Sequence, residues 1–205
     1  LVVGTNVPFH VMLRKPLEMA GVPLYLNMIN SYEDVLKSVD DFGRMAGREK
    51  EAAAKRAQIE RDYAELTQNV QKGKGPKVLV IFGSPDSFNM STKLSFSGDL
   101  VKRLGGVNIA DKAENVKDSS FIPLSMEFVA KENPDVVLLI TMGGSKEILE
   151  KLRSNMRDNA IWHDVNAVKN NRVYQLPPSL FTVNPGTYTI DAMKIMKEYM
   201  YGDVK

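Results

Sequence analysis

Two hydrophobic patterns alternate along this chain. Short continuous apolar runs, typical of strands covered on both faces, occur at 1–4, 22–26, 77–82, 136–140 and 172–176. Between them lie segments with apolar residues three and four positions apart, which predict helices over 10–20, 32–46, 98–104, 125–131, 146–153, 162–168 and 189–201. Strands that alternate with helices in this way predict an α/β fold with parallel strands.

The longest predicted helix runs from Arg48 to Gln71 without Gly or Pro, and it is rich in residues that lose little on entering a helix. Its apolar residues form one narrow stripe: Ala52, Ile59, Tyr63, Leu66 and Val70. At 1.5 Å per residue such a helix spans roughly 35 Å. We predict that residues 48–72 link two Rossmann-like α/β lobes, at 1–47 and 73–205, with a ligand bound between them.

The predicted helix over 32–46 carries clear boundary signals. Ser31 is expected to cap its first turn together with Asp34, and Gly43 and Gly47 mark the bend that follows. Its expected buried face consists of Val35, Val39, Phe42 and Met45.

Composition removes several classes of function. The 205 residues are 43% hydrophobic with a formal net charge of +2, so neither disorder nor a strongly basic nucleic-acid surface is indicated. The absence of Cys excludes disulfides, thiolate metal sites, iron–sulfur clusters and cysteine nucleophiles. There is no apolar run of 18 residues that would predict a membrane span. We expect a monomer.

Candidate binding residues lie in loops that follow the predicted strands, because ligands of open parallel sheets collect at the carboxyl ends of the strands. Four loops meet this description, at 5–10, 83–95, 143–146 and 177–189. The polar and aromatic side chains expected to contact a ligand are Thr5, Asn6, His10, Ser84, Phe88, Lys93, Phe181 and Tyr188. Replacing Lys93 or Tyr188 by Ala is expected to weaken binding without unfolding the protein.

Each signal also has a purely structural explanation. Gly143, Gly144 and Ser145 form either an anion cradle or a plain tight turn. His10 is either a ligand or an ordinary surface histidine, whereas His163 is expected to be structural. The methionines at helical spacing, Met193, Met196 and Met200, are expected to fill the core.

Catalytic motifs are missing from the sequence. It contains no G-x-S-x-G elbow and no H-E-x-x-H motif, and Ser84 has no evident partner histidine. We therefore predict a protein that is not an enzyme, with no catalytic residues, no cofactor and no metal site of its own.

Several phrases, in order and over nearly the whole chain, resemble the substrate-binding proteins of bacterial ABC importers for iron–siderophore, haem and cobalamin. They are LVVG (1–4), LEMAGVP (17–23), GRMAGRE (43–49), LGGVNIA (104–110), SME (125–127), NPDVVL (133–138), Trp162, AVKNNRVY (167–174) and NPG (184–186). The resemblance implies two lobes joined by a helical backbone. It also implies that further residues precede Leu1, so that the first lobe is incomplete here and contributes only part of the site.

The resemblance further implies capture of an iron complex, haem or cobalamin outside the cytoplasm and its delivery to a membrane permease. Glu147 is the candidate for pairing with permease arginines, and a lipid anchor would lie outside this chain. Two alternatives remain open. One is a metal-oxyanion binder of the molybdate type in the same transport family, and the other is a chelatase-like tetrapyrrole enzyme using His10.

Overall fold

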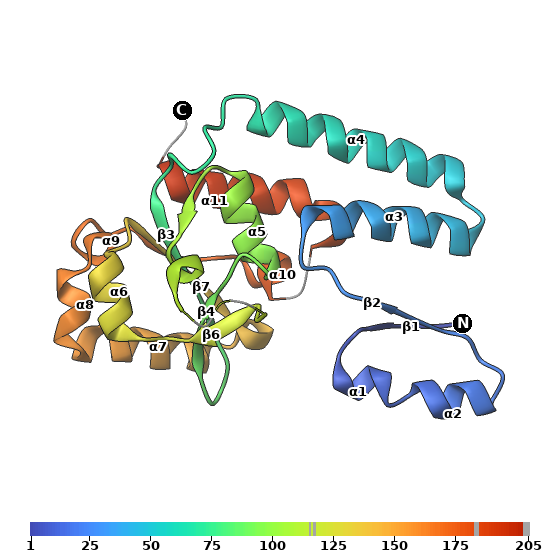
Figure 1. Ribbon diagram of the computed structural model, residues 1–205, viewed down its shortest axis with the longest axis horizontal. Helices are drawn as coiled ribbons and strands as arrows, with labels where there is room; N and C mark the ends of the chain where they lie inside the picture. The colour runs from blue at the N-terminus through green and yellow to red at the C-terminus, as the bar shows by residue number, and fades with distance from the viewer. Residues whose placement is uncertain (115, 117, 183–184, 203–205) are drawn as a thin grey trace.

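The computed structural model describes residues 1–114, 116, 118–182 and 185–202, and it confirms an α/β fold (Figure 1). The strands are β1 (Val2–Thr5), β2 (Leu24–Asn27), β3 (Lys77–Gly83), β4 (Phe88–Ser91), β5 (Val107–Asn108), β6 (Phe121–Pro123), β7 (Val136–Thr141) and β8 (Val173–Gln175). The α-helices are α1 (Pro8–Val11), α2 (Arg14–Met19), α3 (Tyr32–Ala46), α4 (Glu49–Thr67), α5 (Phe96–Arg103), α6 (Met126–Glu132), α7 (Lys146–Asp158), α8 (Ala160–Asp164), α9 (Asn166–Lys169), α10 (Pro178–Phe181) and α11 (Thr189–Tyr201). Three 3₁₀ turns complete the described elements: η1 (Ile109–Lys112), η2 (Met142–Gly144) and η3 (Gly186–Tyr188).

The first 27 residues form a small unit in which β1 and β2 pair in parallel, from Val2 opposite Leu24 to Thr5 opposite Asn27. Two short helices, α1 and α2, replace the single helix predicted over 10–20. Pro16 explains the break, because proline is tolerated only in the first turn of a helix and α2 therefore begins anew just before it.

The larger sheet has six strands in the order β6-β4-β3-β7-β8, with β5 paired to the beginning of β3. β3, β7 and β8 are parallel, as the sequence predicts, but β4 and β6 run antiparallel. These two strands were not predicted, because only Met90 and Ile122 among their residues are fully buried apolar side chains. The sheet is consequently mixed rather than purely parallel.

Helices cover both faces of this sheet, and alternate residues of β3 enter two separate cores. Val78 and Val80 face a core shared with α3, α4, α5 and α11, whereas Leu79 and Ile81 face a core that contains Trp162 of α8. The three methionines of α11 are fully buried, which confirms their role as core residues.

α4 is a single uninterrupted helix that runs back along α3 after the left-handed turn at Gly47 and reaches across to α11 (Figure 1). Ile59 is its only fully buried residue among those described, and Arg56 forms an ion pair with Asp40 of α3. The helix ends at Thr67, earlier than predicted, because residues 68–69 already form a turn.

The boundaries predicted for α3 are confirmed, but its expected buried face is only half right. Val35 is fully buried, whereas Phe42 and Met45 are 43% and 37% exposed. Figure 1 shows the reason, since the second half of α3 extends beyond the unit built on the six-stranded sheet.

Candidate ligand-binding site

Three loops meet at the carboxyl edge of the six-stranded sheet. Gly83 at the end of β3 pairs with Thr141 at the end of β7, so Ser84 and Met142 leave the sheet at the same level. β8 is parallel to β7, and the loop that follows it is tied to the same edge by a 3.0 Å hydrogen bond from the Thr182 hydroxyl to the carbonyl oxygen of Thr141. The beginnings of the loops after β3 and β7 and part of the loop after β8 therefore lie together at this edge.

The first of these loops is the tight turn between β3 and β4. The Ser84 N–H donates to the carbonyl oxygen of Ser87 at 2.8 Å, and the two hydroxyl oxygens lie 3.0 Å apart. The Ser84 hydroxyl thus holds the turn together. Phe88 is half-buried opposite Gly83, so its ring forms part of the edge.

The second loop, between β7 and α7, presents Met142. This side chain is 47% exposed although Thr141 before it is buried. Gly143 and Gly144 follow with positive φ angles of 60° and 70°, which only glycine adopts without strain. The Ser145 hydroxyl then accepts the Ile148 N–H at 3.3 Å and caps α7. This capping favours the tight turn over the anion cradle.

A hollow of about 340 Å³ lies between these two loops. Its lining residues are Pro85, Met142, Ser145, Glu147, Ile148 and Lys151. The Lys151 ammonium donates to the carbonyl oxygen of Pro85 at 3.0 Å and so braces the turn against α7. Glu147 is exposed in the first turn of α7, where a carboxylate is favoured by the helix dipole.

The two aromatic residues predicted as ligand contacts in the third loop differ in their exposure to solvent. Tyr188 is 64% exposed at the end of η3, whereas Phe181 is only 7% exposed and packs in the core. Phe181 therefore supports the edge from beneath instead of lining it. Asn184, part of the NPG phrase, lies outside the described residues.

Lys93 does not share this edge, contrary to the sequence-based expectation. β4 runs antiparallel to β3 and carries the chain away from the edge by the length of a four-residue strand, roughly 10 Å. The Lys93 N–H then donates to the Asp111 carboxylate at 2.7 Å. Burial raises the pKa of that Asp111 carboxyl above its usual value.

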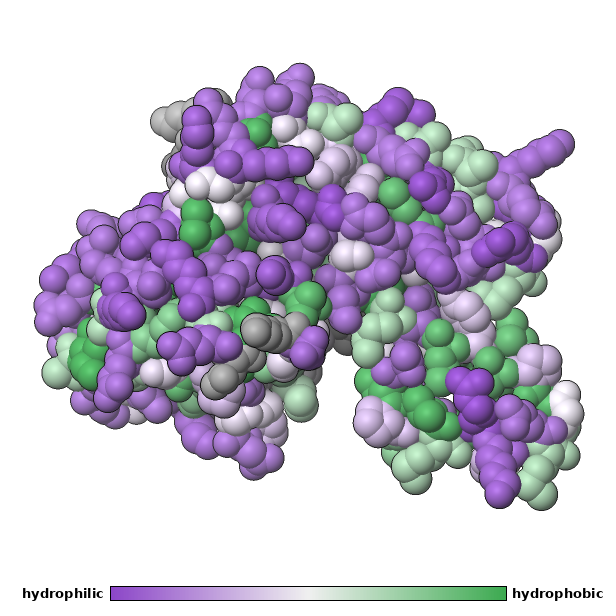
Figure 2. All heavy atoms as spheres, in the orientation of Figure 1, coloured by the Kyte–Doolittle hydropathy of each residue, from purple (hydrophilic) through white to green (hydrophobic). Residues whose placement is uncertain are grey.

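The remaining predicted residues cluster at the carboxyl end of β1. The Thr5 N–H donates to Nδ1 of His10 at 2.9 Å, and the Asn6 N–H donates to the carbonyl oxygen of Asn27 at 2.8 Å. Phe9 and Met12, which the sequence analysis did not single out, are both 72% exposed in this region. Figure 2 shows the molecule indented between this unit and the larger body, with apolar side chains covering much of the smaller unit.

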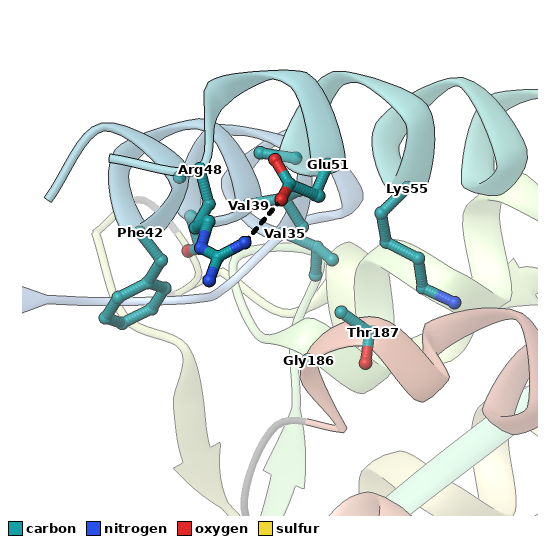
Figure 3. A pocket seen from close by; sticks show the side chains of 11 residues that line it. Val35, Val39, Phe42, Arg48, Glu51, Lys55, Gly186 and Thr187 are labelled. Carbon is teal, nitrogen blue, oxygen red and sulfur yellow. Dashed lines mark hydrogen bonds and ion pairs between the residues drawn. The ribbon is translucent and has the colours of Figure 1, made fainter. Parts of the chain in front are cut away.

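A second hollow, of about 450 Å³, lies between α3, α4 and η3, away from the strand ends (Figure 3). Val35, Val39 and Phe42 supply apolar walls, and an Arg48–Glu51 ion pair of 2.8 Å lies at its rim. None of the residues that the sequence predicts as ligand contacts is among those that line it.

Met142 is the main candidate that sequence reasoning missed. The sequence analysis considered only the methionines at helical spacing, yet the position of Met142 after a buried strand and before two glycines is a signal for an exposed edge residue. Among the described residues, no group of three or more His, Asp or Glu is arranged to hold a metal ion.

Comparisons with known proteins show the family to which this chain belongs. The profile of the family described as Periplasmic binding protein matches residues 15–180. The chain is 31% identical over 192 residues to the high-affinity heme uptake system protein IsdE of Staphylococcus aureus strain MRSA252, covering 93% of this chain and 63% of that protein. The chain therefore spans less than two thirds of that curated relative.

Two solved structures are similar over almost the whole chain. One is an ABC transporter substrate-binding protein from Listeria monocytogenes EGD-e, with a TM-score of 0.84, 27% identity, and coverage of 98% of this chain and 76% of that one. The other is S. aureus IsdE complexed with heme, with a TM-score of 0.83, 26% identity and the same coverage.

Proposed function

Because this chain belongs to the periplasmic binding protein family, whose members are transport components and not enzymes, we propose that it captures an iron-containing ligand for an ABC importer. Haem is the ligand that we propose first, and a ferric siderophore is the second candidate. The observation that carries the proposal is the carboxyl edge of the six-stranded sheet, where Met142 is exposed beside a hollow that Pro85 and Ile148 also line.

We propose the two-lobe arrangement as well. Residues 1–47 would belong to the first lobe, 48–72 would link the lobes and 73–205 would form the second. The separate β1–β2 sheet and the unbroken α4 support this division. The indentation between the two units would then be where the ligand lies (Figure 2).

The chemistry of the edge favours haem over a ferric siderophore. Lys151 is the one cation among the residues that line the edge hollow, and its ammonium already donates to the carbonyl oxygen of Pro85, whereas an anionic siderophore would need several Arg or Lys side chains. A thioether and a phenol are both known kinds of axial ligand for haem iron. We therefore propose Met142 or Tyr188 as a ligand of the haem iron. Phe88 would pack against the porphyrin ring, and the Ser84 hydroxyl would hold the turn that precedes Phe88.

The first unit would complete the site from the opposite side. Thr5, Asn6 and His10 lie at the carboxyl end of β1, and the exposed Phe9 ring is next to His10, with 5.9 Å between the ring centroids. A flat apolar ligand matches this surface because its faces need apolar contact and only its edges need polar partners.

Delivery would require a permease and an extracytoplasmic location. We propose that Glu147 contacts the permease, since its carboxylate is exposed in the first turn of α7 at the rim of the edge hollow. No helix within the described part of the chain is long and apolar enough to cross a membrane.

The test is a haem titration followed by visible absorbance. We expect haem to bind with a shifted Soret band, and Met142→Ala or Tyr188→Ala to change that band and raise Kd at least about tenfold, which corresponds to about 1.4 kcal/mol. Lys93→Ala and Met19→Ala are matched controls, because Lys93 lies away from the edge and Met19 is an 83% exposed methionine of α2. Both should bind as the wild type does.

Thermal shifts separate the alternatives, because a ligand stabilises the folded protein in proportion to its affinity. A rise in Tm with a ferric siderophore but not with haem would replace haem by the second candidate. A rise with molybdate alone would point to the oxyanion alternative. No response to any of these ligands would contradict the proposal.

A further inference from the structure

Three helices meet around one arginine, Arg103, the last residue of α5. Its side chain is only 17% exposed, which is low for a residue with a permanent charge. The residues around it come from the start of α3, the middle of α4 and α5 itself. No part of the candidate ligand site includes it.

The Arg103 guanidinium uses its donors on three separate elements. Nε donates to the Asp99 carboxylate within α5 at 2.6 Å, and Nη1 donates to the Tyr63 hydroxyl of α4 at 3.3 Å. Nη2 donates to the Glu33 carboxylate of α3. One planar group thereby connects α3, α4 and α5.

Aromatic rings reinforce the same junction. Tyr32 of α3 and Tyr63 of α4 are stacked with ring centroids 4.3 Å apart, and the guanidinium carbon of Arg103 lies 5.0 Å and 5.7 Å from those centroids. Both distances are within the range of a cation–π interaction. The Tyr32 N–H also donates to Asp99 at 2.9 Å, so the first residue of α3 is held through its backbone as well as its ring.

α3 in turn carries the β1–β2 unit. The Tyr25 hydroxyl of β2 donates to the Asp41 carboxylate at 2.6 Å, and the Asn27 amide donates to the Ser38 hydroxyl at 2.7 Å. Tyr25 and Asn27 are alternate residues on one face of β2, so the strand rests on α3 along that face. Any rotation of α3 would therefore move the end of β1 and His10 with it.

We propose that Arg103 is a positioning residue that fixes α3, and with it the β1–β2 unit, against the unit built on the six-stranded sheet. Its effect on a ligand rests on the function proposed above, because it would set the spacing between the end of β1 and the edge that carries Met142. Its effect on geometry does not depend on any ligand.

Removing the guanidinium should loosen this junction. A hydrogen bond to a charged group changes an equilibrium by about tenfold or more. Losing the hydrogen bonds to Glu33 and Tyr63 should therefore raise, by at least that factor, the population of molecules in which α3 and the β1–β2 unit are displaced from the larger unit. Lysine keeps the charge but cannot reproduce the planar fork or its stacking on the two rings.

The experiment measures distances by pulsed electron paramagnetic resonance in the ligand-free protein. The chain has no cysteine, so nitroxide labels attach only where Cys is introduced. One pair of labels, at Glu18→Cys on α2 and Glu127→Cys on α6, spans the two units. A second pair, at Glu127→Cys and Lys194→Cys on α11, stays within the larger unit.

We expect Arg103→Met to broaden the distance distribution of the first pair and leave the second pair unchanged, with Arg103→Lys in between. Arg153→Met is the matched control, since Arg153 makes an exposed ion pair with Glu150 on α7. If Arg103→Met does not fold, the same two distance distributions are compared between Arg103→Lys and the wild type.

An unchanged first pair in a folded Arg103 variant would overturn the proposal. Broadening of both pairs would also overturn it, because Arg103 would then hold the larger unit together. An Arg103→Lys distribution identical to that of the wild type would overturn the role given to the forked geometry. Failure of haem to bind affects none of these outcomes, so the two proposals are tested separately.

Discussion

Replacing Ile59 by Ala tests how α4 is anchored. Ile59 is 2% exposed and packs in the core shared with Tyr32, Leu36 and the helices of the larger unit. The change removes three buried carbon atoms at about 0.8 kcal/mol each, roughly 2.4 kcal/mol before any cavity term. Adding the cavity and subtracting the better helix propensity of Ala leaves a loss of about 3 kcal/mol in the free energy of unfolding.

Urea unfolding followed by the fluorescence of Trp162 measures this loss. Trp162 is the only tryptophan of the chain and is 1% exposed in the larger unit, so its emission reports on that unit. At this chain length a loss of about 3 kcal/mol lowers Tm by roughly 6–12 °C. Ile161→Ala is the matched control, because Ile161 is 38% exposed and should cost only about 1–2 kcal/mol.

A cost at Ile59 no greater than that at Ile161 would refute the reasoning. It would mean that α4 is not packed against the core of the larger unit, and the division into two lobes joined by α4 would lose its physical basis.

Two further predictions concern stability. Hydrogen bonds from Lys37 and Tyr25 lower the pKa of Asp41 from 3.8 to about 2. The stability that this carboxylate provides is therefore present above about pH 4 and is lost as the pH falls towards 2. In a pH series, the difference in Tm between the wild type and Asp41→Asn should shrink over that interval. Gly98→Ala should destabilise the protein by several kcal/mol in urea unfolding, because an added Cβ would overlap the Thr92 carbonyl oxygen; stability equal to that of the wild type would contradict the packing described for α5.

Elements with strong local signals could be predicted from the sequence. The boundaries of α11 and α3 agree with prediction, and Ser31 caps α3 as expected. The parallel strands β3 and β7 were evident because both are continuously apolar, as strands buried on both faces must be. In each case the information lies within a few neighbouring residues.

Features that depend on distant contacts were not predictable in this way. β4 and β6 are short and partly polar, and they become strands because each pairs with a neighbour in the sheet. Lys93 was predicted at the carboxyl edge of the sheet because the strand β4, which carries the chain away from that edge, was not recognised. The exposed position of Met142 depends on where β7 ends in the sheet, whereas Phe181 turns inward because α10 packs on the core.

The two left-handed glycines after Met142 have a consequence for how this protein can be altered. Their backbone sets the turn and the buried Thr141 ends the strand, so the shape of this turn does not depend on which side chain stands at position 142. Histidine or tyrosine substituted there would meet the same open surroundings. Under the function proposed above, the side chain offered to the haem iron at position 142 could therefore be changed by a single substitution while the turn keeps its geometry.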